Sequence, residues 1–182
     1  AKATMGWPEE ERKRILGVHV RRGDSCLHAA MSASRPLCMP TKLYLDAIAG
    51  MVDMYDIPAV FLATDSQEAI EEITRFARRR RLQLMYQRFD RNVFSNSFFI
   101  EHMVESGFLE TSVITESTLV DLMLLAECDF FVGSFSSQLS RLALSLLAIR
   151  IGKPPPFISV DGYSWGRHAL EEMWEVTQEL LN

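Results

Sequence analysis

Two adjacent arginines follow a short apolar run in the segment "HVRRGD", residues 19–24. A guanidinium is costly to hold beside a hydrophobic core unless it meets a fixed anion, and its planar fork donates two parallel hydrogen bonds to a phosphate or a carboxylate. The pair therefore indicates one of two arrangements. Either Arg21 binds the phosphate of a ligand, or it pairs within the protein with Asp24 or Asp65.

A second group of residues suited to an anion follows the apolar stretch "FFVG". Ser136, Ser137 and Gln138 are expected to open a helix, whose free backbone N–H groups attract negative charge. Two such groups at neighbouring strand ends would suit a diphosphate. The structural alternative is that Ser136 only caps the helix.

The elements that must position these residues alternate between apolar strands and helices. Strands are expected at 15–20, 59–65, 82–87, 130–135 and 157–162, and helices at 40–56, 66–80, 116–129, 136–150 and over the C-terminal "HALEEMWEVTQELLN". This alternation is typical of a parallel sheet covered on both faces, so the predicted fold class is α/β, a doubly wound, mostly parallel, Rossmann-like sheet. Ligands of such sheets bind at the carboxyl ends of strands, here after Val20, Ala63 and Val132.

The alternation of side chains along the first strand separates the two arginines. His19 and Arg21 should share one face of the strand, and Arg22 should lie on the other. Arg22 would then lie beside the core and pair with a carboxylate such as Asp24 or Asp65. His19 and Arg21 would point together toward a ligand.

Length and composition fit a single globular domain. The chain has 182 residues, of which 48% are hydrophobic and 24% are charged, and its net charge is −5. We expect residues 1–182 to form one domain, cut from a longer protein, with a flexible or linker-like start over residues 1–14. The acidic balance disfavours nucleic-acid binding, so the arginine run at 77–81 is interpreted as a solvated helix end.

Common nucleotide motifs are absent, and the cysteines leave two alternatives open. No G-x-G-x-x-G follows a predicted strand and no P-loop is present, which disfavours a dinucleotide fingerprint and a P-loop NTPase. Cys26 and Cys38 lie twelve residues apart and form either a disulfide, stabilising by roughly 3 kcal/mol, or two separate thiols. Cys128 is expected to be a buried thiol.

Three stretches in order resemble a known family. "HVRRGD", "FLATDS" and "LVDLMLLAECDFFVGSFSSQLSRLA" are similar to the donor-binding lobe of the α1,6-fucosyltransferases, within the superfamily of nodulation and protein O-fucosyltransferases. The resemblance implies the Rossmann-like lobe of a GT-B type glycosyltransferase, with an upstream acceptor lobe in the same chain. It also implies a Golgi or secretory-pathway location if the parent chain carries an anchor.

By position, the resemblance assigns roles to individual residues. Arg21 would grip the β-phosphate of GDP-fucose, where negative charge grows as the bond to fucose breaks. His19 would lie beside the nucleotide. Asp121 would accept hydrogen bonds from the N1 and N2 donors of guanine. Ser137 and Gln138 would contact the phosphates.

The remaining implied roles concern support of the donor and the chemistry of transfer. Asp65 would cap the following helix and support the site, and Arg22 and Ser136 are counted with the donor-binding residues. The family transfers fucose with inversion and without a metal, so neither a metal site nor a cofactor is expected. The partners would be the nucleotide-sugar donor and a glycan or protein acceptor.

One departure from the family pattern concerns the catalytic base. The α1,6 enzymes place a glutamate eight residues after the first arginine of the motif, where this chain has Ala29, and Ser25 replaces the supporting lysine. Asp24 and His28 are the remaining candidates for the base, although a solvent-facing loop histidine is the commoner explanation for His28. The alternative function is therefore a catalytically inactive nucleotide-sugar-binding or partner-docking module.

Overall fold

The computed structural model describes residues 2–8, 14–22, 26, 38–89, 91 and 111–162. The predicted C-terminal helix lies outside these residues. So do the two candidate bases, Asp24 and His28, and the departures at Ser25 and Ala29.

Five parallel strands form one sheet in the described part of the chain. They are β1 (Ile15–Val20), β2 (Ala59–Thr64), β3 (Gln83–Tyr86), β4 (Phe130–Gly133) and β5 (Phe157–Ser159). Their spatial order is β3-β2-β1-β4-β5, and each neighbouring pair is parallel. After β1, the chain adds β2 and β3 on one side of this strand, and it then returns to add β4 and β5 on the other side. This confirms the predicted doubly wound α/β sheet.

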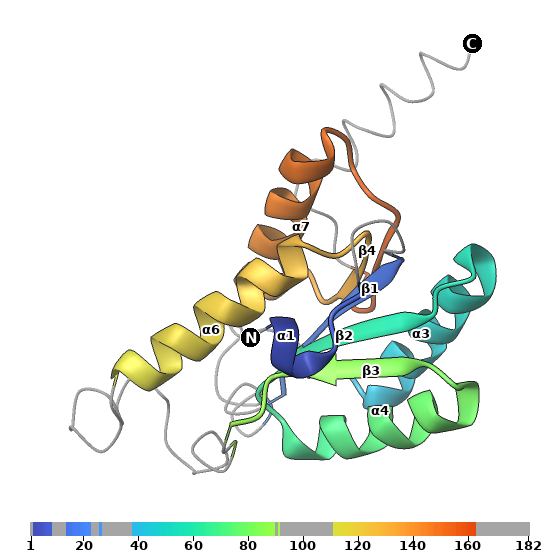
Figure 1. The fold of residues 1–182 in the computed structure, drawn as a ribbon, viewed down its shortest axis with the longest axis horizontal. Helices are drawn as coiled ribbons and strands as arrows, with labels where there is room; N and C mark the ends of the chain where they lie inside the picture. Colours follow the sequence, from blue (N-terminus) through green and yellow to red (C-terminus); the bar gives the residue numbers. More distant parts are fainter. Residues whose placement is uncertain are drawn as a thin grey trace.

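Helices cover both faces of the sheet. Figure 1 shows α3 (Thr41–Tyr55) and α4 (Gln67–Arg80) on one side, and α6 (Thr111–Ala126) and α7 (Gln138–Ile151) on the other. Because the connections turn to opposite sides after β1 and β4, these two neighbouring strands form the topological switch point of the sheet. Ligands of open α/β sheets bind there.

Two hydrophobic clusters explain why the strands are apolar throughout. Ile15 of β1 packs in the cluster under α6 and α7, whereas Leu16, Val18 and Val20 pack in the cluster under α3 and α4. All six residues of β1 are buried. The side-chain alternation predicted for this strand is therefore confirmed.

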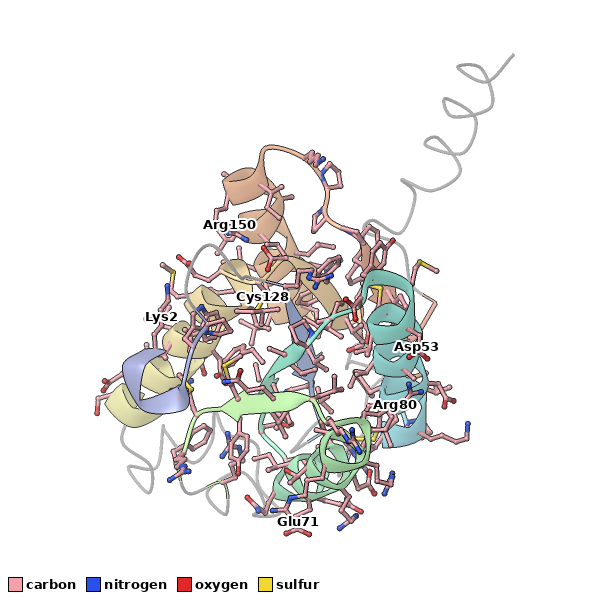
Figure 2. The ribbon with its side chains drawn as sticks, turned by 45° about the vertical axis from the view of Figure 1, so that its right-hand side comes forward. Lys2, Asp53, Glu71, Arg80, Cys128 and Arg150 are labelled. Atoms are coloured by element: carbon pink, nitrogen blue, oxygen red, sulfur yellow. A yellow bond between two sulfur atoms is a disulfide. The ribbon has the colours of Figure 1, made fainter. Side chains whose placement is uncertain are left out.

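Cys128 is a buried thiol, as predicted, and it packs against the central strand. Figure 2 shows its position between the sheet and the upper helices. A Cβ atom added at Gly17 of β1 would lie 3.1 Å from the Cys128 Sγ and 3.2 Å from the Leu125 Cδ2. The absence of a side chain at Gly17 thus allows the end of α6 to approach β1 closely.

Several element boundaries differ from the prediction. α6 begins at Thr111 instead of 116, and its first turn contains no acidic residue that would have marked its start. β4 ends at Gly133 and α7 begins at Gln138, because a turn separates them. β5 ends at Ser159 rather than 162.

The first described residues pack onto the sheet. Residues 2–8 include the short helix α1 (Lys2–Met5), and the Trp7 ring meets the Phe61 ring with centroids 5.5 Å apart. The Lys2 Nζ lies 3.0 Å from the Glu127 carboxylate. This part of the segment predicted to be linker-like is thus attached to the domain.

The arginine run ends α4 as a solvated helix terminus, as predicted. Arg78, Arg79 and Arg80 occupy its last turn and are exposed. Arg80 donates to the Asp53 carboxylate at 2.7 Å, on the outer side of α3 (Figure 2). Among the residues that the structure describes, no helix is long and apolar enough to cross a membrane.

Candidate functional site

Polar residues gather where β1, β2 and β4 end. Arg21 and Arg22 follow β1, Asp65 follows β2, and residues 134–137 follow β4. Because the strands are parallel and adjacent, their carboxyl ends lie along one edge of the sheet. The described candidate residues at these strand ends therefore meet at the switch point.

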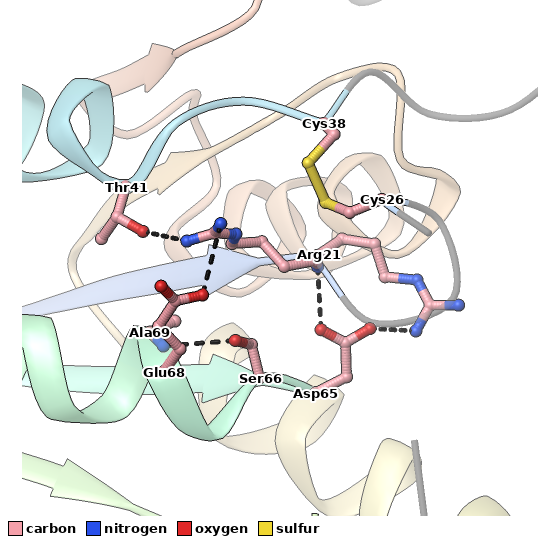
Figure 3. Close-up of a disulfide and its surroundings, with 9 residues drawn as sticks. Arg21, Cys26, Cys38, Thr41, Asp65, Ser66, Glu68 and Ala69 are labelled. Atoms are coloured by element: carbon pink, nitrogen blue, oxygen red, sulfur yellow. Dashed lines mark hydrogen bonds and ion pairs between the residues drawn. A yellow bond between two sulfur atoms is a disulfide. The ribbon is translucent and has the colours of Figure 1, made fainter. Parts of the chain in front are cut away.

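Asp65 connects the ends of β1 and β2. Its Oδ2 accepts a hydrogen bond from the Nη1 of Arg21 in an ion pair, and its Oδ1 accepts one from the Arg22 backbone N–H at 2.8 Å (Figure 3). The Asp65 side chain is only 8% exposed. The pairing of Arg21 with Asp65, which was one of the alternatives from the sequence, is thus present.

Arg22 lies on the opposite face and ties two helices to the strand end. Its Nη1 donates to the Thr41 Oγ1 at 2.5 Å, and its Nη2 lies 3.5 Å from the Glu68 carboxylate. The predicted direction of Arg22 and its pairing with a carboxylate are correct, but the partner is Glu68 and not Asp65, and Asp24 lies outside the described residues. Asp65 lies at the edge of the strands, so it reaches the Arg21 guanidinium and the Arg22 backbone instead.

The cap of α4 is Ser66, and the prediction that Asp65 caps this helix is also wrong. The Ser66 Oγ accepts from the Ala69 N–H at 3.2 Å. Ser66 in turn donates its backbone N–H to the Thr64 Oγ1 at 3.1 Å. Because serine satisfies the first turn of the helix, the Asp65 carboxylate is available to the two arginines.

The loop before α7 is held by Asp161, which follows β5. Its Oδ2 accepts from the Ser136 N–H at 2.9 Å and its Oδ1 from the Phe135 N–H at 3.1 Å. Burial alone would raise the pKa of Asp161, but hydrogen bonds from the Ser159 hydroxyl and from these backbone groups outweigh it and lower the pKa. An ionised carboxylate therefore fixes the turn that leads into the helix.

α7 begins later than predicted, which changes the role of its first residues. Ser137 is the N-cap residue and is buried, but its side chain makes no capping hydrogen bond. Gln138 is the first helical residue and is exposed. Ser136 precedes the N-cap residue and so does not cap the helix, and its backbone N–H donates to Asp161.

His19 is buried against the start of α7. Its Nδ1 lies 2.7 Å from the Ser140 Oγ. A Cβ atom at Gly133 would lie 2.8 Å from that same Oγ, so glycine is required for this close approach of α7 to β4. The pKa of His19 is lowered to about 4, and burial is the main cause. The negative charge of Asp65 raises this pKa, and the positive charge of Arg21 lowers it. The ring is therefore neutral at neutral pH.

Asp121 is buried in α6 and is not an exposed helix acid. It is 7% exposed, and its Oδ1 accepts from the Gln87 Nε2 at 2.6 Å. Burial raises the pKa of Asp121 to about 7, although the Gln87 hydrogen bond and the charge of Arg91 both lower it. This carboxyl group therefore titrates close to neutral pH.

Arg21 at the end of β1 can bind an anion, and the buried Asp121 carboxyl group in α6 can accept hydrogen bonds from a polar ring. A sequence profile of the alpha-(1,6)-fucosyltransferase N- and catalytic domains matches residues 3–154. The chain belongs to the alpha-(1,6)-fucosyltransferase family. The resemblance drawn from the three motifs is thereby confirmed.

Solved structures of POFUT1 share the fold of this domain. POFUT1 in complex with GDP-fucose is 17% identical with a TM-score of 0.56, over 81% of this chain and 41% of that one. POFUT1 in complex with GDP is 16% identical with a TM-score of 0.57, over 83% and 44%. The fucosyltransferase NodZ from Bradyrhizobium is 22% identical with a TM-score of 0.41, over 83% and 39%. A search of curated proteins finds no match.

These likenesses to POFUT1 show that the fucosyltransferase domain has the Rossmann-like α/β fold of one GT-B lobe. The chain spans less than half the length of the solved structures above.

A disulfide lies directly beside the arginine motif of the fucosyltransferase domain. Cys26 and Cys38 are bonded, with Cα atoms 5.0 Å apart (Figure 3). The Cys26 N–H donates to the Arg22 carbonyl at 3.1 Å, and Cys38 shortly precedes Thr41, the first residue of α3. The disulfide and the Arg22–Thr41 hydrogen bond thus join the same two elements, the end of β1 and the start of α3.

Three residues of the fucosyltransferase domain were missed by reasoning from the sequence. Gln87 directly follows β3 and Asp161 lies two residues after the end of β5, so the rule about strand ends would have found them had it been applied to these shorter strands. Arg91 lies in an irregular stretch, where no motif or periodicity marks it. Among the described residues, no cluster suited to a metal ion is found.

Proposed function

We propose that this domain binds GDP-fucose at the carboxyl ends of β1 and β4 and supports fucosyl transfer to a glycan or protein acceptor. The observation that carries the proposal is Arg21, held by Asp65 at the switch point of the sheet. Membership of the family supports it, as do the GDP-fucose and GDP complexes of POFUT1, a protein of the same fold.

In the proposed reaction, Arg21 stabilises the leaving group. The acceptor oxygen bonds to C1 of fucose while the bond from C1 to the phosphate oxygen breaks, and GDP leaves with that electron pair. Negative charge grows on the β-phosphate, so a preorganised guanidinium stabilises the transition state more than the ground state. Attack from the opposite face gives inversion at C1.

The acceptor proton must pass to a base, and the two candidates are Asp24 and His28. Ala29 stands where the α1,6 enzymes place a glutamate, so the base of those enzymes is not inherited. This substitution favours a second candidate function, a nucleotide-sugar-binding module without catalysis. The two functions differ in one measurement. An enzyme converts GDP-fucose to GDP in the presence of an acceptor, whereas a module binds it unchanged.

Asp121 is the proposed reader of guanine. A buried carboxylate accepts strongly from adjacent N–H donors, and N1 and N2 of guanine present two of them on one edge. Adenine lacks this pair of donors. We therefore expect Asp121→Ala to weaken GDP more than ADP in calorimetric titrations, and equal losses for both nucleotides would reject the role.

Metal independence and location are further parts of the proposal. Full GDP-fucose turnover in excess chelator would support catalysis without a metal, and activity restored only by a divalent cation would overturn it. The disulfide Cys26–Cys38 supports a location in the secretory pathway, since disulfides persist in oxidising compartments. Acceptor binding is assigned to an upstream lobe of the same chain.

A further inference from the structure

Gln87 joins the end of β3 to the middle of α6. Its Nε2 donates to the Asp121 Oδ1 at 2.6 Å and to the Ser117 carbonyl at 2.8 Å. A carboxamide nitrogen has two protons, so these two bonds use both of them and fix the orientation of the group. Gln87 therefore holds one particular oxygen of Asp121.

The other oxygen of Asp121 has no such partner. Within the described ranges, no residue donates a hydrogen bond to the Asp121 Oδ2. A carboxylate oxygen is a hydrogen-bond acceptor, so this oxygen can accept from a ligand that presents N–H groups. The Gln87 hydrogen bond thus decides which oxygen is left for a ligand.

Arg91 fixes the segment that carries Gln87. This guanidinium is 4% exposed, and its Nε donates to the Thr64 carbonyl at 2.9 Å. Its Nη2 donates to the Gln87 carbonyl at 2.8 Å, and the group lies 4.0 Å from the centroid of the Phe89 ring. Thr64 immediately precedes Asp65, the partner of Arg21. Arg91 therefore joins the end of β2 to the residue that holds Asp121.

We propose that Gln87 is a specificity-determining residue for the base of the nucleotide, because it holds Asp121 in the orientation that reads guanine. Arg91 is the positioning residue that fixes Gln87 relative to the phosphate-binding end of β2. This inference rests on the proposed function, and it extends the base-reading subsite from one residue to three.

The proposal has a pH dependence that a purely structural role lacks. Asp121 must be ionised to accept both guanine donors, and burial raises its pKa to about 7. The Gln87 hydrogen bond and the Arg91 charge are the two influences that lower this pKa. GDP affinity should therefore rise with pH through about 7, and removing either influence should move the midpoint upward.

The test compares GDP, inosine diphosphate and pyrophosphate in calorimetric titrations at several pH values. Inosine diphosphate keeps N1–H but lacks the 2-amino group, and pyrophosphate reports the phosphate site alone. We expect Gln87→Leu to reduce GDP affinity by about tenfold near neutral pH, to narrow the preference for GDP over inosine diphosphate, and to raise the pH midpoint. Pyrophosphate binding should not change.

Two further variants keep the test falsifiable. Arg91→Lys retains the charge but loses the hydrogen-bonding fork, so it should narrow the base preference with a smaller shift of the pH midpoint than Arg91→Met. The matched control is Gln83→Leu, since Gln83 lies at the opposite end of β3 and its Nε2 donates to the Gly6 carbonyl at 2.6 Å. It should bind all three ligands like the parent protein.

The outcomes separate the two proposals. If the parent protein prefers GDP and Gln87→Leu keeps the same preference and the same pH midpoint, this inference is overturned and the proposed function stands. If the parent protein does not bind GDP, the proposed function is overturned and this inference falls with it.

Discussion

Asp65 binds the guanidinium of Arg21 through Oδ2, while its Oδ1 accepts the backbone N–H of the next residue. A single carboxylate thus fixes both the side chain and the backbone at the end of β1. The ion pair does not exclude a ligand role for Arg21, because a guanidinium has five N–H donors and can hold a carboxylate and a phosphate at once. Asp65 is better described as the residue that orients the arginine.

Replacing this carboxylate should misplace the arginine. We expect Asp65→Asn to weaken GDP binding by about tenfold, since the amide loses the charge that holds Arg21. Calorimetric titration measures this. The matched control is Asp53→Asn, which removes a similar contact to Arg80 at 2.7 Å on the exposed side of α3. Equal affinities for the two variants would show that Asp65 does not orient the site.

Arg22 should matter for stability and not for the ligand. Arg22→Ala removes the hydrogen bond to Thr41 and the contact with Glu68, so the free energy of unfolding should fall by roughly 1.5 to 3 kcal/mol. Denaturant unfolding followed by circular dichroism gives this value. A variant as stable as the parent but deficient in GDP binding would reverse the roles assigned to the two arginines.

His19 should make the domain sensitive to acid. The pKa of His19 is about 4 in the folded protein and near 6.5 when unfolded, so the unfolded state binds more protons between these values. The stability that the neutral, buried His19 ring contributes is therefore fully present above pH 6.5 and is lost as the pH falls toward 4. Asp121, whose pKa is raised to about 7, has the opposite slope across much of this range.

The comparison of His19→Gln with the parent protein isolates the histidine, because both proteins contain Asp121. The difference in their unfolding free energies should change by up to about 3 kcal/mol between neutral pH and pH 4. Denaturant titrations at several pH values measure it. A difference that does not vary with pH would mean that His19 is not held neutral by burial.

The disulfide should stabilise the domain near the site. It closes a loop of sequence separation 12, so reduction should cost roughly 3 kcal/mol by loss of chain entropy. Thermal unfolding with and without reductant tests this, and the double variant Cys26→Ser, Cys38→Ser should be unaffected by reductant. If the parent protein unfolds identically under both conditions, the bridge does not constrain the chain.

The fold could be predicted because its signals are local and repeated. Apolar runs of strand length, such as 15–20 and 59–64, are typical of strands that a parallel sheet buries on both faces. The helix α4 likewise buries apolar residues at helical spacing: Ala69, Ile70, Ile73 and Ala77. The side-chain partners at the strand ends could be predicted only in part. Asp65 was one of two alternatives for Arg21, whereas Glu68 was not named as the partner of Arg22, because the three-dimensional directions of β2 and α4 decide which carboxylate meets which arginine.

The base-reading residues show the same limit. Asp121 matched a motif, but the Gln87–Asp121 and Arg91–Thr64 hydrogen bonds join segments far apart in the chain, at sequence separations of 34 and 27. No periodicity encodes such a contact. The partner that holds Asp121 therefore required the structure.

The most direct test of the account is the titration of GDP into the parent protein and into Arg21→Ala, with ADP, UDP and NAD as competitors. We predict one site that prefers GDP over the other nucleotides, and a loss of about ten- to a hundredfold in GDP affinity when the guanidinium is removed from a domain that still folds. Arg21→Lys should also lose affinity, because it keeps the charge without the fork. An Arg21→Ala protein that binds GDP as tightly as the parent, or that cannot fold, would show that the arginine serves the structure alone and would contradict the account.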